Sequence, residues 1–184
     1  MLRTAAFLCA TAIAVAGAAQ ADDDPPQCLL TASLPAHAPT FAQYPAGPLW
    51  QGKPAAPVLA THMARVFRTQ LRTQSQGKPD FAGHYHIAGW GCGTSCISWG
   101  MVDLKSGQVV MADDHNYGDL DLFHVPDAPL IYRPDSRLLV MLGAPNEKPK
   151  REDYTYLLWT GHVFRQIAFY PYKAHCTVQV EPAP

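Results

Sequence analysis

Four residues with reactive side chains lie close together in the middle of this chain. His84 and His86 are separated by one residue, and Cys92 and Cys96 are separated by three. Residues two positions apart in a strand point to the same face, so the two imidazoles have the spacing needed to meet one metal ion. The two thiols can close a tight turn as a disulfide or remain a reactive pair, and the redox compartment decides between these outcomes.

A metal centre would need further ligands, and the acidic segment after position 112 offers them. Asp114 and His115 could join His84 and His86 if the chain returned to the same place. Zinc takes three or four donors at about 2.0–2.2 Å. Because no spacing fixes a third ligand, we favour the alternative in which the histidines bond to loop groups and the acidic segment is solvated. We therefore expect no metal ion and no other cofactor.

The N-terminus predicts the compartment. A short basic start at Met1-Leu2-Arg3 is followed by an apolar run from Ala5 to Ala19, and then by the small-x-small pattern that ends at Ala21. This is the pattern of a secretory signal peptide over residues 1–21, so we expect a periplasmic or secreted protein. About 15 apolar residues are too few to span roughly 30 Å of hydrocarbon. No later segment is long and apolar enough, and we expect no membrane span in the mature chain.

The cysteines suit an oxidising compartment. Cys9 would leave with the signal peptide, and the cysteines that remain would be Cys28, Cys92, Cys96 and Cys176. Four cysteines allow three pairings. We favour Cys92–Cys96, because Gly91, Gly93 and the small residues after them let the chain fold back tightly. Cys28–Cys176 would then join the ends of the domain, and closing so long a loop contributes about 4 kcal/mol when chain entropy dominates.

The residues before position 75 predict a leader and a helix. Residues 22–57 are rich in proline and alanine, and we interpret them as an extended leader that lies on the domain. Its expected anchors are Phe41, Tyr44, Leu49 and Trp50. From Val58 to Gln74 apolar residues recur at helical spacing and arginines take the other side, which predicts one amphipathic helix. Its apolar positions are Val58, Leu59, Met63, Val66, Phe67 and Leu71.

After Pro79 the pattern predicts short strands separated by turns. The expected strands cover residues 81–90, 97–104, 108–112, 131–132, 137–142, 154–159 and 162–170. Gly107 suits a left-handed position in a hairpin loop, and Pro134 suits the second position of a turn. We predict an α+β, mainly β fold in a single domain over residues 58–176, with a tail at 177–184. One N-terminal amphipathic helix precedes a six- to seven-stranded antiparallel meander, arranged as a single sheet or a small barrel.

Three groups of residues carry a resemblance. They are Asp80–Tyr85 with Trp90–Cys96, Val102–Leu104 and Gly107, then Pro134–Val140, and then Tyr156 with Trp159 and Gly161. In these motifs, over roughly residues 58–170, the chain resembles a family of exported bacterial proteins of uncharacterised function. The third motif departs slightly from the family's Tyr-x-Leu-x-Trp-x-Gly pattern. The resemblance implies an exported β-rich domain and transfers no catalytic residue.

Charge and motifs argue against several functions. The net charge of −1, with no basic run, offers no electrostatic surface for nucleic acid. The sequence contains no GxSxG motif, no HExxH motif and no phosphate-binding glycine loop. We therefore expect a non-enzymatic binding or inhibitor-type protein with a protein partner in the cell envelope.

The rigid turn closed by Cys92 and Cys96 is the expected binding surface, since a rigid turn loses little entropy on docking. The candidate binding residues are Trp90, Thr94, Ser95, Trp99, His84 and His86. One alternative is a metal-assisted or His/Asp-dependent hydrolase that acts on an envelope component through His84, His86 and Asp114. Another is that the turn only stabilises the fold and has no site beside it.

Overall fold

The computed structural model describes residues 37–115, 117–118, 120–121, 129–145 and 153–171, together with two short strands at 28–30 and 176–178. Within these residues the fold is mainly β with few and short helices, which confirms the predicted class at that level. The expected signal peptide and residues 179–184 of the expected tail lie outside the described residues.

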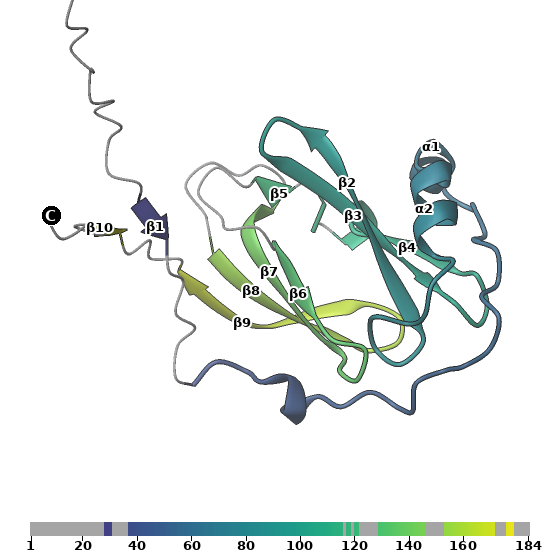
Figure 1. The fold of residues 1–184 in the computed structure, drawn as a ribbon, viewed down its shortest axis with the longest axis horizontal. Helices are drawn as coiled ribbons and strands as arrows, with labels where there is room; N and C mark the ends of the chain where they lie inside the picture. The colour runs from purple at the N-terminus through teal and green to yellow at the C-terminus, as the bar shows by residue number, and fades with distance from the viewer. Residues whose placement is uncertain are drawn as a thin grey trace, which may run out of the picture.

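The main strands form two groups (Figure 1). The first contains β2 (Tyr85–Gly93), β3 (Cys96–Asp103) and β4 (Val109–Met111). The second contains β6 (Leu130–Tyr132), β7 (Leu138–Pro145), β8 (Asp153–Trp159) and β9 (Phe164–Pro171). The two-residue strand β5 (Leu120–Asp121) pairs with the end of β3 and with the end of β7, so it links the groups. Every pairing in this sheet is antiparallel.

The largest apolar core of the described residues fills the space between the two groups, which β5 connects at one end. Trp99 and Met101 of β3 enter it from one side, and Leu139 of β7 and Trp159 of β8 enter it from the other. These are alternate positions along their strands, as expected when one face of a sheet is buried. The main strands therefore have one inward and one outward face.

The predicted single helix is instead two short helices with a break at Phe67. They are α1 (His62–Val66) and α2 (Arg68–Gln74). The Thr61 side chain accepts a hydrogen bond from the Ala64 amide and so begins α1 four residues later than expected. Val58 lies outside the helix, where its amide donates to the Gly107 carbonyl. No helix of the described residues is long and apolar enough to cross a membrane.

The helices cover the outer face of the first group. Ala64 and Leu71 are fully buried against β2, β3 and β4, and Phe67 stacks on Trp90 with ring centroids 4.4 Å apart. Val66, expected on this apolar face, is 49% exposed. Ala64, Phe67 and Leu71 share one face at spacings of three and four residues, and Val66 lies on the opposite side.

The described part of the leader, from residue 37, lies on the domain through backbone hydrogen bonds as well as apolar contacts. The Trp50 amide donates to Gly83, and the Ala55 amide donates to Leu104. Phe41, at the start of a short 3-10 helix (Phe41–Gln43), packs with Tyr44 on the outer face of the second group. Trp50 packs against the helix side of the first group. Leu49 is 43% exposed and is not an anchor.

Two of the motif segments contact each other beside the leader. Ala82 and Gly83 both have positive φ, and their amides donate to the carbonyls of Ser136 and Pro134. The buried Ser136 hydroxyl lies 3.0 Å from the Phe41 carbonyl and 2.9 Å from the Tyr44 carbonyl. In the structure, these residues connect the start of β2 to the turn before β7.

The two remaining strands hold the outer cysteines. β1 (Cys28–Leu30) and β10 (Cys176–Val178) form a separate antiparallel pair, in which Cys28 lies opposite Val178 and Cys176 lies opposite Leu30. The side chains of Cys28 and Cys176 are outside the described part of the structure, so their disulfide stays a prediction.

Candidate functional site

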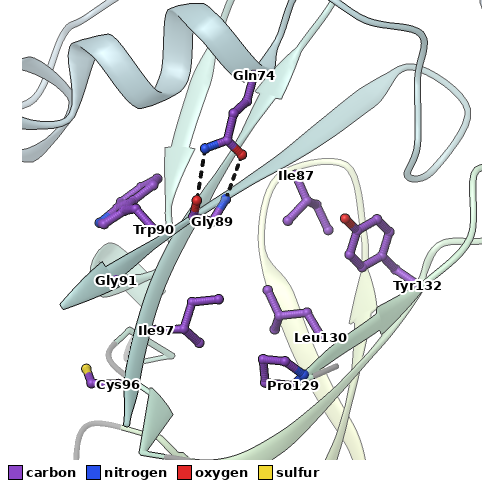
Figure 2. A pocket seen from close by; sticks show the side chains of 10 residues that line it. All are labelled: Gln74, Ile87, Gly89, Trp90, Gly91, Cys96, Ile97, Pro129, Leu130 and Tyr132. Carbon is purple, nitrogen blue, oxygen red and sulfur yellow. Dashed lines mark hydrogen bonds between the residues drawn. The ribbon is translucent and has the colours of Figure 1, made fainter. Parts of the chain in front are cut away.

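An open apolar hollow of about 630 Å3 lies between the β2–β3 hairpin and β6. We call it the β2–β6 hollow. Its lining residues are Gln74, Ile87, Gly89, Trp90, Gly91, Cys96, Ile97, Pro129, Leu130 and Tyr132. In Figure 2 the side chains of Ile87, Ile97, Leu130 and Tyr132 lie in the space between the hairpin and β6. Its volume and apolar lining are those of sites that bind small molecules or buried side chains.

Two glycines on the inward face of β2 create this space. Ile87 fills its inward position and belongs to the central core, but the next two inward positions are Gly89 and Gly91. A Cβ atom added at Gly91 would meet nothing within 4 Å, and one added at Gly89 would first meet Ile97 at 3.4 Å. Glycine inside a strand leaves the surface bare where another group can approach. The hollow therefore follows directly from these two residues.

The backbone beside the hollow is held in place by Gln74, the last residue of α2. Its side-chain amide donates to the Gly89 carbonyl at 2.9 Å and accepts from the Gly89 amide at 3.1 Å (Figure 2). This paired hydrogen bond covers the edge of β2 as a neighbouring strand would. The two hydrogen bonds hold the backbone at Gly89 against the end of α2.

Tyr132 gives the hollow one polar end, and Asp80 supports it. The Asp80 carboxylate accepts from the Ile87 amide at 2.9 Å and lies 3.1 Å from Nδ1 of His86. Burial, followed by the Asp80 charge, raises the pKa of Tyr132 to about 12. Burial also raises the pKa of Asp80, although His86 opposes this shift. The Tyr132 hydroxyl therefore stays protonated at neutral pH.

The predicted Cys92–Cys96 disulfide is present at the tip of the β2–β3 hairpin, next to the hollow. The Cα atoms of the two cysteines are 5.2 Å apart, and the strand register shifts between Gly91 and Gly93 to bring them together. At the tip itself Ser95 has φ 55°, a left-handed conformation that is common in tight turns. Thr94 at this tip is exposed and Ser95 is partly exposed, as expected for a presented turn.

The two tryptophans expected beside the turn point to opposite faces of the hairpin. Trp90 is 7% exposed and packs under α1 and α2, while Trp99 is 1% exposed and packs in the central core. The Trp99 indole donates to the Tyr117 carbonyl at 2.9 Å. Both indoles support the hairpin from inside, so the exposed surface of the tip is formed by smaller residues.

The two histidines are near each other in sequence but face different carboxylates. His84 Nε2 lies 3.8 Å from Asp103, whereas His86 Nδ1 lies 3.1 Å from Asp80. Burial, followed by the nearby Lys105 charge, lowers the pKa of His84, and Asp103 opposes this shift. The imidazoles therefore belong to two separate polar contacts.

The other candidate metal ligands lie on the 3-10 turn Asp113–His115, where Asp114 is exposed. The side chain of His115 lies outside the described part of the structure. Among the residues that the structure describes, no three histidine, cysteine, aspartate or glutamate side chains form a group that could hold a metal ion.

Sequence reasoning missed the hollow, although one signal for it was present. Gly89 and Gly91 occupy alternate positions of a predicted strand, and this spacing places two missing side chains on the same face. The sequence alone could not predict the wall of the hollow that faces β2. Leu130 and Tyr132 come from a strand about 40 positions later, and the approach of β6 depends on its pairing with β7.

Comparison with known proteins gives no further constraint on this site. The chain matches no family model, no curated protein and no solved structure.

Proposed function

We propose that this protein is an exported, non-enzymatic binding domain that holds an apolar group of its partner in the β2–β6 hollow. The disulfide-closed hairpin tip lies beside the hollow and would contact the rest of the partner. The observation that carries this proposal is the bare inward face at Gly89 and Gly91, next to a rigid tip.

The lining favours an apolar guest. Ile87, Ile97 and Leu130 offer aliphatic surface, and burial of such surface contributes about 25 cal/mol per Å2. The Tyr132 hydroxyl interacts with the Asp80 carboxylate, so its oxygen is left to accept one hydrogen bond from a guest and orient it. A few polar groups in an apolar cavity are the usual basis of specificity.

The rigidity of the walls favours binding as well. The disulfide fixes the tip, and the Gln74 amide fixes the middle of β2. A site that is already ordered loses less conformational entropy when a partner docks. Thr94, exposed at the tip, and its neighbour Ser95 would then supply polar contacts at the rim.

The proposal is tested by filling the hollow. N-phenyl-1-naphthylamine, a neutral apolar dye whose fluorescence rises in apolar surroundings, is titrated into the purified protein. The variant Gly91→Leu places a side chain in the open space and should weaken dye binding at least about tenfold, since it occupies the volume that the dye needs.

Gly77→Leu is the matched control. Gly77 is exposed and also has nothing within 4 Å of an added Cβ, but it does not line the hollow. This variant should bind the dye as the wild type does. Equal dye affinity in the wild type and Gly91→Leu, with both proteins folded by circular dichroism, would show that the hollow is not the binding site.

A further inference from the structure

A second pocket, of about 250 Å3, lies where the leader meets the start of β2 and the β8–β9 turn. The residues that matter here are His84, Tyr85, Lys105, Arg137 and Trp159. None of its lining residues is shared with the β2–β6 hollow. We propose that this pocket binds a small oxyanion, either a carboxylate or a phosphate group.

Positive charge at the pocket favours an anion. Lys105 and Arg137 both line the pocket, and no carboxylate lines it. Arg137 Nε donates to the Pro45 carbonyl at 3.3 Å, which holds the guanidinium in place. Within the described part of the chain, neither the Lys105 ammonium nor the terminal guanidinium nitrogens of Arg137 have an ion-pair partner. Two positive charges therefore meet at a pocket in a protein of net charge −1.

The nearest acidic group is already engaged. The Asp103 carboxylate accepts from the Lys105 amide at 2.9 Å and from the Ser106 hydroxyl at 2.8 Å, and it lies 3.8 Å from His84. These contacts hold Asp103 at the turn after β3, where it lies next to His84 at the rim of the pocket. It leaves the side chains of Lys105 and Arg137 available to an added anion.

The wall of the pocket also carries a buried N–H donor. Trp159 is 2% exposed, and its indole Nε1 makes no well-formed hydrogen bond among the described residues, although the Tyr85 hydroxyl lies beside it. The ring of Tyr85 meets the Trp159 ring edge-on with centroids 5.5 Å apart, which brings a hydroxyl donor to the same wall. Buried polar groups in native proteins are almost always paired. Trp159 and Tyr85 both line the pocket, and an oxyanion bound there would offer these donors a stronger acceptor.

Size and chemistry together define the class of ligand. A volume of 250 Å3 is below the usual range of about 300–1,000 Å3 for drug-sized ligands, so a small group fits best. Arginine binds carboxylate and phosphate oxygens through its planar fork, and lysine adds a point charge. The pocket combines both with neutral N–H and O–H donors.

The test is a calorimetric titration of the purified protein with sodium phosphate and, in a separate arm, with sodium acetate. Each is measured against sodium chloride at equal ionic strength. We expect saturable binding of at least one oxyanion, and the tighter arm identifies phosphate or carboxylate. Lys105→Gln and Arg137→Gln should each weaken that binding about tenfold, because each removes one charge-assisted contact.

Two further variants complete the design. Trp159→Phe removes the indole donor while keeping an aromatic ring, and it should also weaken binding. Lys53→Gln, an exposed lysine outside the pocket, should leave it unchanged. If Arg137→Gln does not fold because the leader detaches, the proposal is tested by Lys105→Gln, since Lys105 is exposed and its substitution should not disturb folding. No saturable binding of either anion, or wild-type affinity in Lys105→Gln, would overturn the proposal.

Discussion

The two ends of β2 use glycine in opposite ways. Near the leader, Gly83 and the neighbouring Gly107 have φ of 83° and 78°, and an added Cβ at either would press on a backbone carbonyl of the leader. Near the disulfide tip, Gly91 meets nothing within 4 Å and Gly89 is only in ordinary contact with Ile97. Glycine at the first end allows close packing, and glycine at the second end leaves space. The comparison separates the part of the molecule that stabilises the fold from the part that can receive a partner.

The largest expected effect comes from Gly107→Ala. The new Cβ would collide with the Ala56 carbonyl and would occupy a backbone conformation that side chains rarely adopt. We expect a loss of about 3 kcal/mol in the free energy of unfolding, measured by urea denaturation. Gly91→Ala, the same substitution at the other end, should change it by less than about 0.5 kcal/mol. Equal losses would remove the distinction between the two ends.

A smaller effect is expected from opening the tip. The double variant Cys92→Ser with Cys96→Ser removes a cross-link over a five-residue loop, which should lower the free energy of unfolding by about 2 kcal/mol. It should also weaken dye binding, because Gly91 and Cys96 line the hollow. Dithiothreitol should weaken dye binding by the wild type in the same way and should leave dye binding by the double variant unchanged. Unaltered dye affinity in the reduced protein would show that the disulfide at the tip does not affect binding in the hollow.

The smallest expected effect is a pH dependence at the leader end. Burial lowers the pKa of His84 below its usual 6.5, so between the two values the unfolded chain takes up a proton more readily than the folded one. The stability associated with neutral His84 is therefore complete above pH 6.5 and is lost as the pH falls through the lowered pKa. Urea unfolding at several pH values should show that His84→Gln loses less stability on acidification than the wild type. A greater loss of stability on acidification in His84→Gln than in the wild type would show that the pKa of His84 is not lowered in the folded protein.

Local patterns predicted much of this fold. Short segments separated by turn residues indicated the strands, Gly107 indicated a left-handed turn position, and the glycines around Cys92 indicated a tight disulfide. Each of these features depends on residues within a few positions of one another. The mainly β class follows from the same local signals.

The features that could not be predicted depend on contacts between distant residues. The break at Phe67 occurs where its ring stacks on Trp90, and no helical period records that contact. His84 and His86 have the spacing of a shared site, but Asp103 and Asp80 approach them from different elements. Ser136 holds the leader through carbonyls more than 90 positions away. Tertiary packing decides these positions, so spacing alone assigned them the wrong neighbours or none.

The most direct test of the account is to observe the four glycines during dye binding. In a two-dimensional amide NMR spectrum of the purified protein, N-phenyl-1-naphthylamine should shift the signals of Gly89 and Gly91 in a saturable way. The signals of Gly83 and Gly107 should stay in place. Saturable shifts at Gly83 and Gly107 instead, or none at Gly89 and Gly91 while the dye is bound, would contradict the assignment of the hollow as the binding site.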